Sequence, residues 1–203
     1  MGGKITLPTF DKNGRVIYGI ENFSATSKIT EVYFLDNAQY TIVGPAAFAD
    51  SGITVAHLPS TIQHIGANAF RYAYNLEQIA LSDSILSIGD EAFMGLSATS
   101  CLKVHIDRLP ENLVYLGQRS FYNCGPNVTI SSLPSGITKV PAQCFMSAPG
   151  VTINELPAKD SGVECTIGTQ AFAYNSNNNT VTTFTINAPW VFDGAPISVE
   201  KGY

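Results

Sequence analysis

Charged side chains are scarce in this chain of 203 residues. Asp, Glu, Lys and Arg make up 13% of it, whereas an average soluble domain carries roughly a quarter. Ser, Thr, Asn and Gly take their place, and this composition favours a β-rich protein outside the cytoplasm. The net charge is −5, and no basic stripe is present that would follow a phosphate backbone. We therefore expect neither a nucleic-acid partner nor attraction to an anionic membrane surface.

Long apolar runs are also absent. No run approaches the roughly 18 residues that cross a bilayer, and the first residues lack the pattern of a secretory signal peptide. We expect no membrane insertion by this chain. A signal peptide or a surface anchor would therefore lie outside it.

Cysteine is rare, and no two of the four cysteines form a Cys-x-x-Cys pair. Four thiols in a chain of this length do not make a disulfide scaffold. Their spacings of 23, 20 and 21 residues resemble a structural repeat rather than a set of metal ligands. We expect buried structural thiols rather than a catalytic nucleophile. They are Cys101, Cys124, Cys144 and Cys165.

A motif of the form Gly-x-x-x-Phe recurs along most of the chain, usually with a small residue just before Phe. Successive copies place their Phe 25, 22, 23, 28, 24 and 27 residues apart. Pro141 replaces the glycine in one copy. An apolar pair usually precedes the glycine, as Ile62 and Ile65 precede Gly66. The repeated phenylalanines are Phe23, Phe48, Phe70, Phe93, Phe121, Phe145 and Phe172.

A second motif, apolar-x-x-apolar-x-apolar, lies between the copies of the first. Its last two apolar positions alternate with polar ones, which is the period of a strand with one buried face. A Leu-Pro pair often follows, as at Leu58-Pro59, and proline ends the strand and turns the chain. The last two apolar positions are Val32/Phe34, Ala56/Leu58, Ile79/Leu81, Val104/Ile106, Val128/Ile130, Val151/Ile153 and Phe184/Ile186.

The alternation of the two motifs predicts a stack of coils. One unit of 22 to 28 residues is too small to bury its own apolar side, whereas stacked units share one continuous core. Each coil would supply a short parallel strand, a proline turn, a second extended stretch and a glycine turn. We expect each Phe to lie on a short helical or 3₁₀ piece and to fill the core, with about seven coils in all.

The repeated unit resembles the BspA-type leucine-rich repeat family. The resemblance is carried by Ile62-Gln-His-Ile65-Gly66-Ala-Asn-Ala69-Phe70 followed by Leu76-x-x-Ile79-x-Leu81, and it covers about residues 16 to 189. It implies a curved, β-rich leucine-rich repeat solenoid of the α/β type, found in secreted or surface proteins of host-associated bacteria. Some relatives are adhesins that bind host matrix proteins. The chain departs from the pattern after Leu81, at Glu164 and in an Asn/Ser-rich insertion at 173–180.

We predict a single solenoid domain over 1–203. Residues 1–18 form an N-terminal cap, 19–187 the repeats and 188–203 a C-terminal cap. Asn13-Gly14 is a strong turn signal and predicts a capping hairpin within 4–18. The tail contains the only tryptophan, Trp190, which we expect to close the last coil.

The polar position between the last two apolar strand residues predicts the binding surface. Stacked parallel strands align these positions into one row on the solvent side of the sheet. The row is aromatic and imidazole at one end and threonine at the other, and threonine is also simply a good strand former. His57 and His105 would lie two coils, or roughly 10 Å, apart, too far for one metal ion. The row reads Tyr33, His57, Ala80, His105, Thr129, Thr152 and Thr185.

Motifs for catalysis and for cofactors are lacking. The glycines follow the repeat instead of forming GxGxxG or a P-loop, and no HExxH or other closed metal-ligand set is present, so we expect no cofactor and no metal. A glycoside hydrolase would need two carboxylates in one cleft. Asp90-Glu91 and Asp107/Glu111 qualify only by proximity, and solvated turn residues are the simpler interpretation.

The leading hypothesis is a noncatalytic surface or secreted module that binds a protein or glycan ligand through its sheet face. A host matrix protein is one such partner. Tyrosines near the Phe turns would widen the surface, because tyrosine offers a large contact area with a polar tip. A structural spacer in a larger surface protein is the main alternative, and a hydrolase with an acid pair is the other. The tyrosines are Tyr72, Tyr74, Tyr122 and Tyr174.

Overall fold

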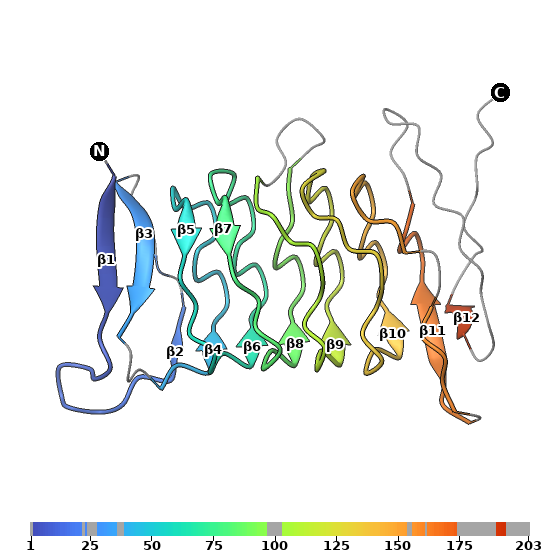
Figure 1. Ribbon diagram of the computed structural model, residues 1–203, viewed down its shortest axis with the longest axis horizontal. Coiled ribbons are helices and arrows are strands. Elements are labelled where there is room, and N and C mark those ends of the chain that lie inside the picture. The colour runs from blue at the N-terminus through green and yellow to red at the C-terminus, as the bar shows by residue number, and fades with distance from the viewer. Residues whose placement is uncertain are drawn as a thin grey trace.

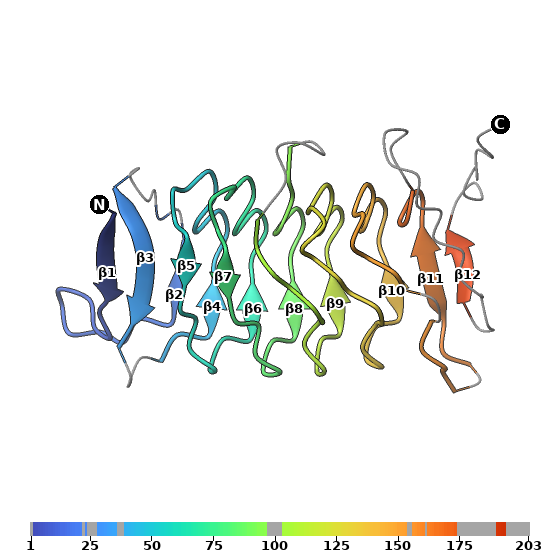
Figure 2. The same cartoon turned by 45° about the horizontal axis from the view of Figure 1, so that its top comes forward.

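The computed structural model is a row of coils stacked along one axis (Figure 1). It describes residues 2–21, 23, 28–35, 39–96, 103–153, 156–160, 162–173 and 190–193. No helix occurs in these ranges, and hence none that is long and apolar enough to cross a membrane. The first strand and the last lie at opposite ends of the stack, and the turned view shows the same order (Figure 2).

Short parallel strands form three sheets. Their orders are β1-β3-β5-β7, β2-β4-β6-β8-β9 and β10-β11-β12, and every strand pair in them is parallel. The bounds are β1 Gly3–Leu7, β2 Gly19–Ile20, β3 Ile29–Phe34, β4 Ile42–Val43, β5 Val55–Ala56, β6 His64–Ile65, β7 Gln78–Ile79, β8 Ser87–Ile88, β9 Tyr115–Leu116, β10 Lys139–Val140, β11 Cys165–Gly168 and β12 Trp190–Asp193.

Successive coils therefore contribute to two lines of strands. The first line is the sheet from β1 to β7, and a single parallel bridge between Ile106 and Val128 lies further along the chain. The second line runs from β2 to β9 and continues through β10, which lies beside β9. The predicted parallel leucine-rich repeat solenoid is confirmed.

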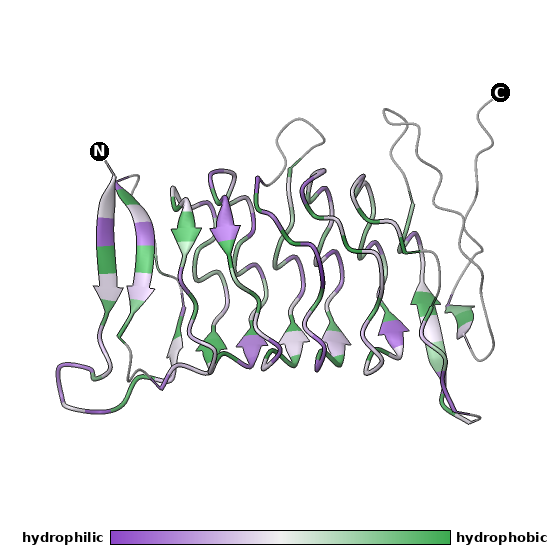
Figure 3. Cartoon of the chain, viewed as in Figure 1, coloured by the Kyte–Doolittle hydropathy of each residue, from purple (hydrophilic) through white to green (hydrophobic). Residues whose placement is uncertain are grey.

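Apolar side chains from both lines of strands fill one core. Hydrophobic stretches recur in coil after coil along the stack (Figure 3). The strand positions that the second motif marks as apolar are buried at Val32, Ala56, Val104, Ile106, Val128, Ile130, Val151 and Ile153. The second line adds Val43, Ile65, Ile88, Leu116, Val140 and Ile167.

The repeated phenylalanines form one continuous stack through this core. Six rings from Phe48 to Phe172 lie nearly parallel, with neighbouring centroids between 5.3 and 5.6 Å apart. Phe23 meets Phe48 edge-on at 5.8 Å. The described residues thus contain about six coils, and the predicted seventh, around Phe23, lies only partly within them.

The prediction that each Phe lies on a helical or 3₁₀ piece is wrong. From Phe48 to Phe172 the residue two before Phe adopts positive φ, and in most of these turns so does the residue two after it, as with Asn68 (60°) and Tyr72 (58°) around Phe70. Because positive and negative φ alternate along the turn, every second backbone N–H points to the next coil and donates a hydrogen bond there. In a helix these N–H groups would instead donate within their own turn. Three such bonds join this coil to the next, from Asn68 to Asp90 (2.8 Å), from Phe70 to Ala92 (2.8 Å) and from Tyr72 to Met94 (2.9 Å).

This turn ladder, meaning three N–H groups of each Phe turn bonded to the next coil, recurs from Ala46 to Ser147. Left-handed backbone costs about 1–2 kcal/mol for a residue with a side chain. Bonds to the neighbouring coil offset that cost, because an unpaired buried N–H would be costlier still. The residues with positive φ are Ala46, Asp50, Asn68, Tyr72, Glu91, Arg119, Asn123, Gln143, Ser147 and Gln170.

The recurring glycine permits close approach of successive coils. A Cβ on Gly117 would lie 2.2 Å from the nitrogen of Asp90 and 2.3 Å from the carbonyl carbon of Gly89. Neither neighbour is a flexible side chain, so any side chain at Gly117 would push the two coils apart.

The ends of the stack extend the sheets. β1 pairs parallel with β3, while the turn at Asn13-Gly14 closes a short hairpin through an antiparallel bridge between Phe10 and Val16. Trp190 is buried in β12, and its indole N–H donates to the carbonyl of Pro157 at 3.0 Å. Most of the predicted C-terminal cap at 188–203 lies outside the described residues.

Removing one ring from the Phe stack tests how much the stack contributes to stability. Phe93 is fully buried between Phe70 and Phe121, at 5.3 and 5.4 Å. Phe93→Ala should lower the free energy of unfolding by roughly 3–5 kcal/mol, as measured by denaturant titration. The control Val114→Ala removes a side chain that is 56% exposed and should change it by less than about 0.5 kcal/mol. Equal effects would show that the stack is not the core.

Candidate functional site

The predicted binding row lies on the outer side of the first line of strands. His57, His105, Thr129 and Thr152 are exposed, and Tyr33 is half-buried. Thr185 lies outside the described residues. The pairing of β3 with β5 and of β5 with β7 places Tyr33, His57 and Ala80 side by side, as expected.

The aromatic end of the row is held in place by its neighbours. The rings of Tyr33 and His57 stack at 4.2 Å with an interplanar angle of 19°. The Tyr33 hydroxyl donates to Glu31 at 2.6 Å, and Lys4 pairs with the same carboxylate at 2.9 Å. Both hydrogen bonds lower the pKa of Glu31, and the one from Tyr33 has the larger effect. The carboxylate therefore stays charged and keeps the tyrosine oriented.

The predicted alignment of His105 with Thr129 is wrong by two residues. Ile106 pairs with Val128, which places His105 opposite Asn127 and Asp107 opposite Thr129. The sequence allowed this error because a shift of two residues keeps every side chain of a strand on the same face of the sheet. Since the apolar positions of both coils stay buried in either register, hydrophobic periodicity alone does not choose between the two.

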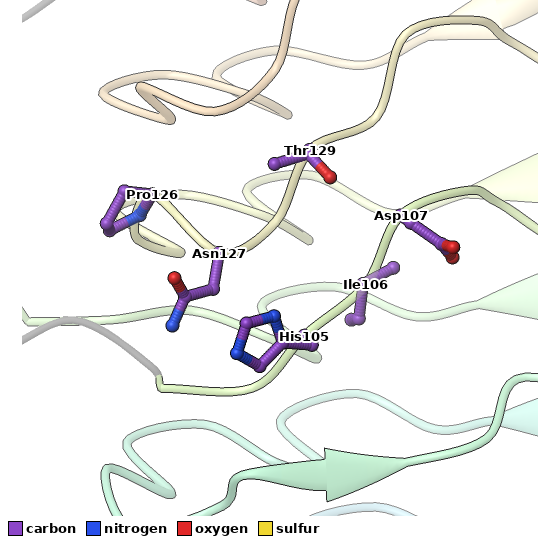
Figure 4. A pocket seen from close by; sticks show the side chains of 6 residues that line it. All are labelled: His105, Ile106, Asp107, Pro126, Asn127 and Thr129. Atoms are coloured by element: carbon purple, nitrogen blue, oxygen red, sulfur yellow. The ribbon is translucent and has the colours of Figure 1, made fainter.

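The two paired segments around Ile106 and Val128 border a shallow hollow on the sheet face. The hollow has a volume of about 340 Å³, and Ile106 and Pro126 line it together with four polar residues. Figure 4 shows His105 beside Asn127, with Asp107 and Thr129 toward the other side. The hollow therefore gathers two residues of the predicted row with two that the prediction did not include, Asp107 and Asn127.

The second line of strands carries an exposed row that the sequence analysis missed. Register aligns Ile42, His64, Ser87 and Tyr115. The side chains of His64 and Ser87 form a hydrogen bond of 2.8 Å, while Tyr115 and Ile42 are 52% and 39% exposed. The signal was available in the sequence, because each of these residues stands two positions before the residue that opens the Phe turn.

The tyrosines near the Phe turns are less exposed than predicted. Tyr72, Tyr74 and Tyr122 are half-buried, and Tyr174 lies outside the described residues. The rings of Tyr72 and Tyr74 stack at 5.8 Å, and burial raises the pKa of Tyr74. The guanidinium of Arg71 lies 4.4 Å from the Tyr72 ring centroid and donates to its hydroxyl. These contacts make Tyr72 and Tyr74 part of the coil packing.

The candidate acid pairs are mostly engaged in structural contacts. Asp90 accepts the backbone N–H of Gln118 at 2.8 Å, and Glu91 lies between Arg71 at 3.4 Å and Arg119 at 3.5 Å. Asp107 instead lines the hollow. The side chains of the described residues form no group of three or more His, Cys, Asp or Glu that would hold a metal ion.

Three of the four thiols are confirmed as buried: Cys124, Cys144 and Cys165. Cys101 lies outside the described residues. The sulfur of Cys144 lies 3.2 Å from the hydroxyl of Ser120, and burial raises the pKa of Cys144 to about 12. Such a thiol carries almost no thiolate at neutral pH and is a poor nucleophile.

The family is settled by the match to a repeat model. The model described as BspA type Leucine rich repeat region (6 copies) matches residues 4–107 and 97–189. The chain belongs to the BspA-type leucine-rich repeat family. The resemblance predicted from the repeated unit is thus confirmed, and no curated protein shows significant similarity.

Several solved structures resemble this BspA-type chain at low identity. A leucine-rich repeat protein from Bacteroides ovatus is 21% identical, covering 80% of this chain and 47% of its own, with a TM-score of 0.47. A leucine rich cell surface protein from Faecalibacterium prausnitzii is 19% identical, covering 84% of this chain and 50% of its own, with a TM-score of 0.44. The pneumococcal vaccine antigen PcpA is 15% identical, covering 94% of this chain and 83% of its own, with a TM-score of 0.34. The chain spans about half the length of the first two.

Thiol alkylation tests the structural role of the cysteines in this BspA-type solenoid. In a Cys101→Ser variant at pH 8, iodoacetamide should leave Cys124, Cys144 and Cys165 unmodified in the folded state, because burial blocks access of the reagent. In Cys144 the raised pKa also disfavours the thiolate. In guanidinium chloride all three should react, as counted by mass spectrometry. A thiol alkylated at the same rate in both states would contradict the assignment.

Proposed function

We propose that this chain is a noncatalytic interaction module that binds a protein or glycan ligand through the outer face of its first line of strands. The observation that carries the proposal is the pairing of a fixed aromatic stack, Tyr33 on His57, with an open hollow at His105 on the same face. Aromatic side chains that are already ordered lose little conformational entropy when a ligand covers them.

The family and the composition support the remaining parts of the proposal. BspA-type repeats are an interaction fold, and a stack of coils offers an extended surface for a partner. A chain rich in Ser, Thr and Asn with few charges suits an exported or surface-attached protein. A host matrix protein is the partner class that the family resemblance favours.

Simultaneous substitution of the aromatic and imidazole residues tests this face. Ligands would first be identified by screening the purified chain against glycan and matrix-protein arrays. Tyr33→Ala, His57→Ala and His105→Ala combined should weaken binding about tenfold or more in surface plasmon resonance, because they remove the stack and one wall of the hollow. The thermal unfolding midpoint provides the check that the fold is retained.

A matched control comes from the second line of strands. His64→Ala combined with Tyr115→Ala removes an imidazole and an aromatic ring from the other exposed row and should leave affinity unchanged. Loss of binding in this control, with none in the triple variant, would move the ligand to the other face.

A further inference from the structure

The hollow between the coils of His105 and Asn127 lies on the proposed binding face. Ile106 is 4% exposed and Pro126 is exposed, so its lining combines apolar surface with polar side chains. Its volume of about 340 Å³ lies at the lower end of the range for small-ligand sites, roughly 300–1,000 Å³. It therefore suits a small ligand or one unit of a larger one.

Three of the four polar side chains of the hollow are not held by hydrogen bonds of the fold. In the described part of the chain, the side chains of His105, Asp107 and Thr129 make no hydrogen bond or ion pair. Asn127 donates its amide to the carbonyl of Lys103 at 3.0 Å, which fixes the amide and leaves its oxygen directed elsewhere. An imidazole, a carboxylate, a hydroxyl and an amide oxygen are thus open to a ligand within one hollow.

This set of groups matches a hydroxyl-rich, uncharged molecule. Carboxylate and amide oxygens accept hydrogen bonds from hydroxyl groups, while the Thr129 hydroxyl and an imidazole N–H donate to them. The rings of Pro126 and His105 offer surface for the C–H face of a sugar ring. We infer that the hollow is a subsite for a neutral saccharide, an inference that rests on the proposed function of this face.

Charge disfavours the other ligand classes. A single carboxylate with no Lys or Arg among the lining residues repels an acidic sugar, a phosphate or a sulfate. A lysine side chain of a protein partner would use Asp107 and leave the other three groups unpaired, which is costly once they are covered. A neutral sugar pairs all four.

The full chain can be tested with the methyl glycosides and disaccharides of glucose, galactose and mannose, using saturation-transfer NMR and calorimetry. At least one should bind, and Asp107→Ala should weaken that binding about tenfold or more, since a charged acceptor is lost. Asp107→Asn keeps the shape and should give a smaller loss. Tyr115→Ala, an exposed residue on the second line of strands, is the control and should have no effect.

The outcomes separate this inference from the proposed function. Failure of every neutral sugar to bind, or binding that Asp107→Ala and Asn127→Ala leave unchanged, overturns the saccharide subsite. A protein ligand lost with Tyr33→Ala and His57→Ala but not with Asp107→Ala overturns the subsite while supporting the face. Binding only of a lysine-rich peptide in an Asp107-dependent manner overturns the saccharide class. A sugar lost with Asp107→Ala supports the inference whatever the aromatic variants do.

Discussion

Everything in this protein depends on the inability of a single coil to satisfy itself. A unit of some two dozen residues has too little volume to hide a phenylalanine ring, and its extended backbone has no internal partners for its N–H and C=O groups. Stacking solves both problems at once, because Phe70 is covered by Phe48 on one side and by Phe93 on the other. The left-handed residues of the Phe turns follow from the same need, since they present their N–H groups to the next coil.

The core could be predicted from the sequence, because the spacing of apolar residues reports burial directly. The spacing of Phe located the stacked rings, and the apolar alternation located the strands of the first line. The turn conformation was not predictable in this way. Left-handed backbone is usually signalled by glycine or asparagine, whereas here it also falls on Glu91, Arg119 and Gln143, whose side chains favour other regions. Contacts between coils impose it, and a single coil read alone does not show them.

The candidate site was only partly predictable for a related reason. Periodicity placed Tyr33, His57 and His105 on the outer face, where the two histidines are exposed and Tyr33 is half-buried. It does not give which residue of one coil lies opposite which residue of the next. A register shift of two brought Asp107 and Asn127 to the hollow. The division between buried and outward positions explains how such a fold carries function. The buried core fixes the coils, while the outward positions are free to differ from coil to coil.

The turn ladder also gives the solenoid a direction. The carbonyl of Ala67 accepts from Ala46, and the N–H of the same peptide unit, on Asn68, donates onward to Asp90. Peptide groups are thus linked head to tail through successive coils, as they are along an α-helix, and their dipoles add rather than cancel. Every carbonyl in these chains faces the N-terminal end of the stack. The two ends of the solenoid are therefore electrically unlike, with partial negative charge toward the N-terminal end and partial positive charge toward the C-terminal end.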